Sequence, residues 1–171
     1  MHTFQDMPAD LIERDPFTDF GVDGALLTSG VGDRVNAMTI TWGMMGVLFN
    51  MNVVTVFVED SRYTKELMDW SGVFSISFFE GKQKSLLKYF DKVSGRRENK
   101  FATSGLTVNE HKGIPFVDDS SFAIVCRLVC RTKIKEEDII DSDVIAKLYS
   151  GENKGNTHTM YVGEIVDFLA R

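Results

Sequence analysis

The chain has 171 residues, of which 43% are apolar and 26% charged, and its net charge is −6 at pH 7. This balance is typical of one globular domain with a sizeable core, and an acidic surface disfavours nucleic acid, whose phosphates are bound by clustered Lys and Arg. No apolar run approaches the roughly 20 residues of a membrane span and the N-terminus lacks the apolar segment of a signal peptide, so we expect a cytoplasmic protein that does not contact membranes.

The chain is expected to begin with a lead-in segment, residues 1–20, and to continue as one domain over residues 21–171. Two strands, 24–30 and 35–43, are predicted to form a hairpin, because a Gly-Asp turn separates them. The run VVTVFV at 53–58 predicts a third strand, and its continuous apolar character indicates burial on both faces.

Two short helices are predicted on either side of a fourth strand, which spans residues 71–79. The first helix follows Ser61, a favourable N-cap residue, and the second is expected over residues 82–90. Residues 91–105 are polar and contain glycine, so they are expected to form a loop.

The C-terminal half contains two longer predicted strands, residues 120–135 and 159–170, separated by an acidic connection and a polar loop. Cys126 and Cys130 lie in the first of these strands, which would hold them about 13 Å apart. A disulfide requires Cα atoms within about 7 Å, so we expect two reduced thiols. Because the two cysteines are badly spaced and the histidines scattered, no metal site is expected.

About seven strands and two or three short helices predict a mainly β fold, a small barrel with helical additions. The elements do not alternate as β-α-β, and no G-x-G-x-x-G sequence follows a strand. A dinucleotide-binding Rossmann domain is therefore not expected.

Four residues at the start of the first helix offer groups that suit an anion: Ser61, Arg62, Tyr63 and Thr64. The first amides of a helix have no intrahelical partner and carry the positive end of its dipole. The planar guanidinium of Arg62 matches phosphate oxygens, and two hydroxyls add donors. Taken alone, these residues are more typical of an ordinary helix start with a surface arginine.

The second strand has a polar and an apolar face. Threonine hydroxyls could meet the polar edge of a heteroaromatic ring, while Met and Trp offer polarizable apolar contact. The alternative is a plain core strand of a barrel. Alternation places Asn36, Met38, Ile40 and Trp42 on one face and Thr39 and Thr41 on the other.

The most basic stretch of this acidic chain is residues 92–101, which could close over a negatively charged ligand or form a solvated loop. His158 opens the last strand and could donate to a cofactor or relay a proton. A single histidine is, however, more often a surface or packing residue.

Five segments in this order resemble the flavin reductase-like family of FMN-binding split barrels. They are NAMTITWG (36–43), SRYT (61–64), FSISFF (74–79), SGRRENKF (94–101) and HTMYVGEI (158–165). The resemblance covers the chain from about Gly21 to its end, and it implies a homodimer of Greek-key split β-barrels with FMN bound near the subunit interface.

The resemblance also implies roles for individual residues. The strand 36–42 would line the isoalloxazine ring, the start of the first helix would hold the 5′-phosphate, and the basic loop would approach the cofactor. The residues expected to bind FMN are Asn36, Met38, Thr39, Ile40, Thr41, Trp42, Ser61, Arg62, Tyr63, Thr64, Ser94, Gly95, Arg96 and Lys100, with His158 near the flavin as the candidate catalytic residue.

The activity implied is that of an oxidoreductase, in which NADH or NADPH reduces bound FMN and electrons pass to free flavin or another acceptor. Without a Rossmann domain, the reduced nicotinamide would bind in the open cleft over the flavin. One alternative is an FMN-binding electron carrier, similar to flavoredoxin, that a protein partner reduces without NAD(P)H. Another is a flavin-storage or sensing module without turnover.

Overall fold

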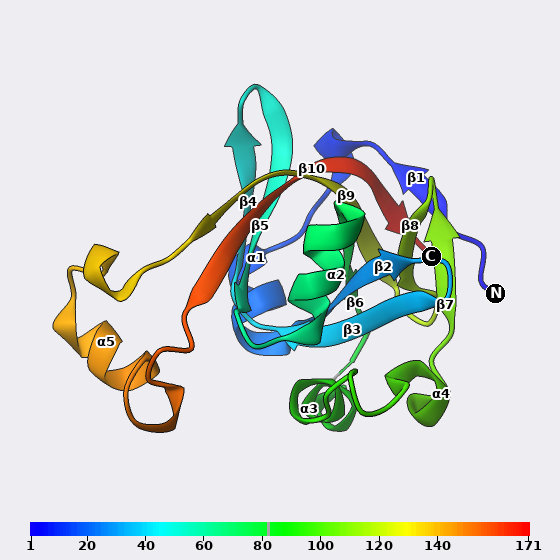
Figure 1. Ribbon diagram of the computed structural model, residues 1–171. Coiled ribbons are helices and arrows are strands. Elements are labelled where there is room, and N and C mark those ends of the chain that lie inside the picture. The colour runs from blue at the N-terminus through cyan, green and yellow to red at the C-terminus, as the bar shows by residue number, and fades with distance from the viewer. Residues whose placement is uncertain (82) are drawn as a thin grey trace.

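The computed structural model describes residues 1–81 and 83–171, and most of its regular structure is β-strand (Figure 1). The strands are β1 (Gln5–Met7), β2 (Ala25–Val31), β3 (Arg34–Ile40), β4 (Gly43–Leu48), β5 (Met51–Glu59), β6 (Val73–Phe78), β7 (Val108–His111), β8 (Ile114–Val117), β9 (Phe122–Lys133) and β10 (His158–Ala170). The helices are α1 (Pro16–Thr18), α2 (Tyr63–Ser71), α3 (Lys84–Lys92), α4 (Lys100–Ser104) and α5 (Ser142–Leu148). Lys82, with which the second predicted helix begins, lies outside the described residues.

Most strands belong to one antiparallel sheet in the order β3-β2-β6-β9-β10-β5-β4, and β1 also pairs with β10. The sheet curls, so that β3 at one end approaches β5 near the other without hydrogen-bonding to it. The result is a barrel with a split between β3 and β5. The mainly β fold expected from the sequence is confirmed, although the described residues contain five helices where two or three were expected.

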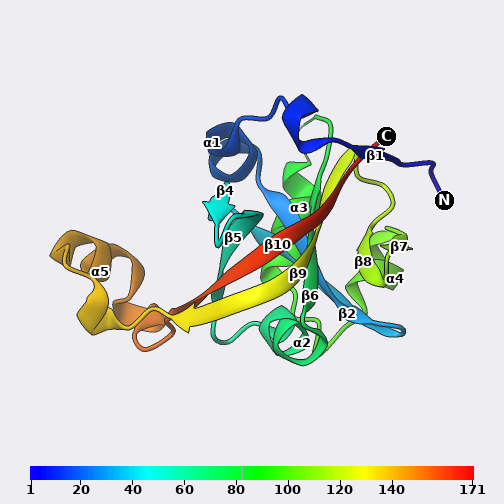
Figure 2. The same cartoon turned by 90° about the horizontal axis from the view of Figure 1, so that it is seen from above.

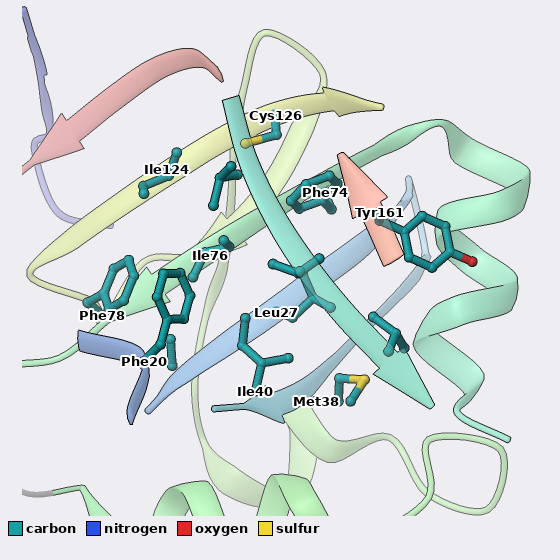
Figure 3. Packing of buried hydrophobic residues seen from close by; sticks show 14 of the residues in the cluster. Phe20, Leu27, Met38, Ile40, Phe74, Ile76, Phe78, Ile124, Cys126 and Tyr161 are labelled. Atoms are coloured by element: carbon teal, nitrogen blue, oxygen red, sulfur yellow. The ribbon is translucent and has the colours of Figure 1, made fainter. Parts of the chain in front are cut away.

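The barrel interior is apolar, and β6 shows how the sequence fills it. Phe74, Ile76 and Phe78 alternate along this strand and point into the core, as Figure 3 shows. The intervening Ser75 and Ser77 lie on the opposite face and are also buried. Successive side chains of a strand point to opposite faces, so the apolar residues of β6 face the core and its serines face away from it.

The opposite face of β6 is covered by the separate β7–β8 hairpin. The Ser75 hydroxyl donates to the carbonyl of Pro115, and the amide of Val117 donates to the Ser77 hydroxyl. A second apolar cluster joins α3 and α4 to β2 and β3; it comprises Leu26, Ala37, Phe90, Phe101 and Val117. These contacts hold α3 and α4 beside the split.

The β4–β5 hairpin was not predicted. The expected strand 35–43 ends at Ile40, and Gly43 begins β4, which pairs antiparallel with β5. Phe49 and Asn50 form the turn with φ of 54° and 58°. A two-residue turn of this kind needs positive φ at both positions, and Phe rarely adopts it, so the sequence carried no clear turn signal.

The start of α2 differs from the prediction. Its N-cap is Arg62, and Ser61 precedes it, so the expected capping role of Ser61 is wrong. The helix ends at Ser71 and is capped by Gly72, whose φ of 71° is left-handed and whose amide donates to the Met68 carbonyl. Helix α4 begins inside the predicted loop 91–105, because the Asn99 side chain accepts a hydrogen bond from the Ala102 amide and caps it.

The first residues of the chain are held against the barrel by β1 and by a hydrogen bond between the His2 ring and the Asp118 carboxylate, 2.9 Å apart. Nearby, the His111 ring lies 2.8 Å from the Asp167 carboxylate. Asp6, His111 and Asp167 form the single cluster within residues 1–81 and 83–171 whose spacing suits a metal ion. The Lys112 ammonium already lies 2.5 Å from Asp167 and supplies the positive charge there.

Strands β9 and β10 extend beyond the barrel, and residues 134–157, here called the arm, join their far ends (Figures 1 and 2). The arm carries α5 away from the barrel body. In β9 both Cys126 and Cys130 are free thiols, as expected, and Cys126 is buried. Among the described residues, no helix has the length and apolar character needed to cross a membrane.

Candidate functional site

Two adjoining cavities lie at the split between β3 and β5. The first, the aromatic cavity, has a volume of about 210 Å³ and is lined by Met38, Thr39, Ile40, Thr41, Trp42, Phe57, Glu59, Arg62, Asp91, Leu148, Asn153 and His158. The second, the basic cavity, has a volume of about 220 Å³ and is lined by Asn36, Met38, Glu59, Ser61, Arg62, Tyr63, Thr64, Asp91, Lys92, Val93, Ser94, Gly95, Arg96 and Lys100. Four lining residues are common to both, so the two cavities share a wall.

All 15 residues singled out from the sequence line one or both of these cavities. The structure thus brings together β3, the start of α2, the basic loop and the start of β10, which are separated by up to about 120 residues of chain. The binding roles of these residues remain a prediction. Sequence reasoning missed several lining residues, notably Glu59 and Asp91 at the junction and Leu148 and Asn153 from the arm.

Arg62 stands at the junction of the cavities, where carboxylates already bind it. Its Nε donates to Glu59 Oε2 at 2.8 Å, and its terminal nitrogens donate to the Asp91 carbonyl at 2.7 Å and the Asp91 carboxylate at 2.9 Å. An anion that reached Arg62 would share the guanidinium with both acidic residues. The guanidinium expected to suit phosphate oxygens is therefore already hydrogen-bonded within the protein.

Asn36, Thr64 and Gly95 join three segments at the floor of the basic cavity. The Asn36 amide donates to the Thr64 hydroxyl at 2.9 Å, and both side chains are buried. A Cβ at residue 95 would lie 2.1 Å from Asn36 Oδ1. The loop backbone can approach β3 this closely only because residue 95 is glycine.

Lys100 is a buried cation that faces the basic cavity. Its residue is 3% exposed, its Nζ donates to the Phe90 carbonyl at 3.0 Å, and the same Nζ lies 5.1 Å from the centre of the Phe90 ring. Burial, assisted by the charge of Arg62, lowers the pKa of Lys100 to about 8. Across residues 1–81 and 83–171 no carboxylate lies within ion-pair distance of Nζ, so a bound anion would supply the missing charge.

Arg96 fastens the basic loop to the first turn of α2. Its guanidinium donates to the Ser61 carbonyl at 2.9 Å and to the Glu66 carboxylate, and it lies over the Tyr63 ring. Ser94 begins the tight turn in this loop, since its carbonyl accepts from the Arg97 amide. These contacts shape the outer wall of the basic cavity.

The aromatic cavity is bounded by Trp42 and His158, whose ring centres lie 4.6 Å apart. Because β3 ends at Ile40, Trp42 does not continue the strand face as expected, and it is 37% exposed. The Thr39 hydroxyl donates to the Leu87 carbonyl at 2.6 Å, which anchors β3 to α3. Burial lowers the pKa of His158, so its imidazole is neutral at pH 7.

Comparison with known proteins identifies the family of this chain. The family model described as flavin reductase like domain matches residues 20–171. The uncharacterized protein YddH of Escherichia coli K12 is 32% identical over 117 residues, which cover 66% of this chain and 61% of YddH. The match therefore spans about three fifths of the length of that relative.

Solved structures share the fold. Flavoredoxin from Methanosarcina acetivorans aligns with a TM-score of 0.64 and 23% identity, over 87% of this chain and 68% of that one. The FMN-binding protein from Thermus thermophilus with bound p-hydroxybenzaldehyde aligns with a TM-score of 0.66 and 20% identity, over 98% of this chain and 82% of that one. At these identities the likeness concerns the fold alone.

Proposed function

The chain belongs to the flavin reductase like domain family, and on this premise we propose that it binds FMN across the two cavities and passes electrons from NADH or NADPH to free flavin or another acceptor. The observation that carries the proposal is the continuity of an aromatic cavity with a basic one at the split of the barrel. Structural neighbours named flavoredoxin and FMN-binding protein support it.

The residues present suit the two ends of FMN. The aromatic cavity offers Trp42, Phe57 and Met38 to a flat apolar ring, and the basic cavity offers Lys100 and Arg96 to a phosphate. The buried ammonium of Lys100, which lacks a carboxylate partner, favours a phosphate over a neutral ligand. When bound, FMN would supply the redox chemistry, and the protein would orient it and exclude water from one side.

The basic cavity is also shaped to receive a charged group at the start of α2. Glu59 and Asp91 hold the Arg62 side chain between the two cavities, so its guanidinium is positioned before any ligand arrives. In the proposal, Lys100 and the hydroxyls of Ser61 and Ser94 face the phosphate, while Arg62 lies closer to the chain that joins phosphate and ring. Positioning of this kind reduces the ordering cost of binding.

A carrier that a protein partner reduces is the second candidate, and the net charge of −6 suits a basic partner. The visible spectrum of the FMN-loaded protein under anaerobic conditions distinguishes the two functions. Bleaching by NADH or NADPH, faster than that of the same concentration of free FMN, supports the oxidoreductase. Bleaching by dithionite alone supports the carrier, and failure to take up FMN refutes both.

We also propose that the protein forms a homodimer, which the β4–β5 hairpin supports. Strand β4 pairs with β5 alone among the described strands, and apolar side chains of this hairpin are exposed: Met44 by 53%, Val47 by 74% and Phe49 by 61%. An exposed apolar edge of this kind favours association. Light scattering during size-exclusion chromatography measures the mass, and Val47→Lys is expected to shift a dimer towards monomer; a wild-type monomer at high concentration contradicts the proposal.

A further inference from the structure

Tyr149, a residue of the arm that no sequence pattern indicated, contacts the candidate catalytic histidine. Its residue is 4% exposed, and its hydroxyl oxygen lies 3.0 Å from Nδ1 of His158. The two rings meet edge to face with centres 5.6 Å apart, and Trp42 packs against the same imidazole. The imidazole is thus held between an aromatic residue from the arm and one from the connection between β3 and β4.

The direction of the Tyr149–His158 hydrogen bond follows from the partners within reach. In the described part of the chain, Nδ1 of His158 is the single side-chain or backbone partner of the Tyr149 hydroxyl. A buried hydroxyl hydrogen without an acceptor is costly, so the tyrosine donates and Nδ1 accepts. Burial raises the pKa of Tyr149 and lowers the pKa of His158, so at pH 7 the phenol keeps its proton and the imidazole carries one. That one proton therefore resides on Nε2.

The Nε2 atom of His158 opens to the aromatic cavity. No hydrogen-bond partner of Nε2 occurs within residues 1–81 and 83–171. In this part of the chain, Thr28 Oγ1 is the single fully buried side-chain polar atom that lacks a hydrogen-bond partner. Nε2 also lacks a partner, so it cannot be fully buried and must retain contact with solvent. Since His158 lines the aromatic cavity, its solvent contact lies there.

We propose that Tyr149 is a positioning residue, which fixes His158 as the Nε2–H tautomer so that a neutral hydrogen-bond donor faces the ligand in the aromatic cavity. The ligand's identity rests on the proposed function, and its acceptor would be a nitrogen or oxygen at the flavin edge. A donor there stabilises the negative charge that a reduced flavin carries, and so favours reduction. The tautomer itself is a property of the protein without ligand.

The first test is therefore made on the apoprotein by ¹⁵N NMR of the histidine side chains. Protonated and unprotonated ring nitrogens have well separated shifts, and His158 is assigned by its loss in His158→Ala. The expected spectrum has a protonated Nε2 in the wild type and a mixture of both tautomers in Tyr149→Phe. Tyr89→Phe, which removes a tyrosine hydroxyl bound to Glu98 instead, is the matched control and should retain the wild-type pattern. A protonated Nδ1 in the wild type overturns the proposal.

The second test is made on the FMN-loaded protein and follows the reduction potential. Loss of the oriented donor in Tyr149→Phe should lower the equilibrium constant for flavin reduction by roughly fivefold, as expected for one net hydrogen bond. In a His158→Ala background the same change should have no effect, because Tyr149 acts through the histidine. An equal effect in both backgrounds, or none in either, overturns the positioning role. A protein that takes up no FMN contradicts the proposed function instead, and the apoprotein spectrum still decides the tautomer.

Discussion

Lys100→Met is the most informative perturbation of the basic cavity, because it should raise the stability of the apoprotein while it weakens FMN binding. The pKa of Lys100 is about 8 in the folded protein and 10.5 in an ordinary lysine. At pH 7 the side chain is charged in both the folded and unfolded states, and the folded state bears the cost of burying that charge. A lowering of this size corresponds to about 3 kcal/mol, from which the loss of the hydrogen bond to Phe90 subtracts about 1 kcal/mol.

The sign of the pH dependence follows from the same shift. Between pH 8 and 10.5 the unfolded chain keeps the Lys100 proton that the folded protein has released, so the stability of the wild type should rise across this window. Lys100→Met should be about 2 kcal/mol more stable than the wild type at pH 7 and should lack this rise. Urea unfolding of the apoproteins from pH 7 to 10 measures both. Lys147→Met, at an exposed position of α5, is the control and should behave as the wild type.

The effect on FMN has the opposite sign. Loss of a charge-assisted contact with phosphate should weaken binding by about 2 kcal/mol, or roughly thirtyfold. The affinity of the wild type for FMN should also fall above pH 8, because the apoprotein has then released the Lys100 proton and must take it up again to bind phosphate. The variant should show no such fall. Fluorescence titration of FMN measures the affinity. Unchanged affinity together with a destabilised apoprotein would refute the reasoning, since it would make Lys100 a structural residue alone.

Three other substitutions probe the cavities and the core. Gly95→Ala should weaken FMN binding at least tenfold in calorimetric titration, because its Cβ would lie 2.1 Å from Asn36 Oδ1 and push the basic loop away. Gly163→Ala places a Cβ 2.5 Å from the Phe74 ring, so the free energy of unfolding in urea should fall by about 1 to 3 kcal/mol, and an unchanged value would show that the ring can move. Arg62→Ala leaves two carboxylates at the junction without their cation, so FMN affinity should fall by about 2 kcal/mol or more. Full affinity in the variant would show that Arg62 does not contribute to FMN binding.

The strands were the most predictable part of the fold, because runs of apolar and β-branched residues bounded by polar or glycine-containing segments indicate them. β5 is buried along most of its length as its apolar run indicated, and β6 lies within the strand expected over residues 71–79. The hairpin turn at Phe49 and the pairing of β1 with β10 were not predictable from local patterns. Both depend on tertiary contacts that override weak local preference.

The segments that form the candidate site were easier to predict from the sequence than their arrangement in space. Asn36, Ser61 and Lys100 were identified by residue type and by resemblance, and all of them line the basic cavity. Asp91 could not be predicted, because it ends an ordinary amphipathic helix and its partner Arg62 is 29 residues away in sequence. Tyr149 was equally hidden, since it lies in the arm directly after α5, where no local pattern indicates a contact with His158.

The charges at the junction change which residues should contribute most to phosphate binding. Arg62 was one of the residues expected from the sequence to hold the phosphate, yet Glu59 and Asp91 already bind its guanidinium. A phosphate that approached Arg62 would gain a shared cation and would also meet two carboxylates, so the net attraction there is reduced. Among the described residues no carboxylate lies within ion-pair distance of Lys100, and Asp91 acts on its charge only at longer range. Lys100 also lies in a drier environment, where a charge pair is stronger. Lys100, and not Arg62, should therefore account for the larger electrostatic share of FMN affinity. Lys100→Met compared with the triple variant Glu59→Gln/Arg62→Met/Asp91→Asn, which removes Arg62 together with its two carboxylate partners, tests that order directly: Lys100→Met should lose more affinity.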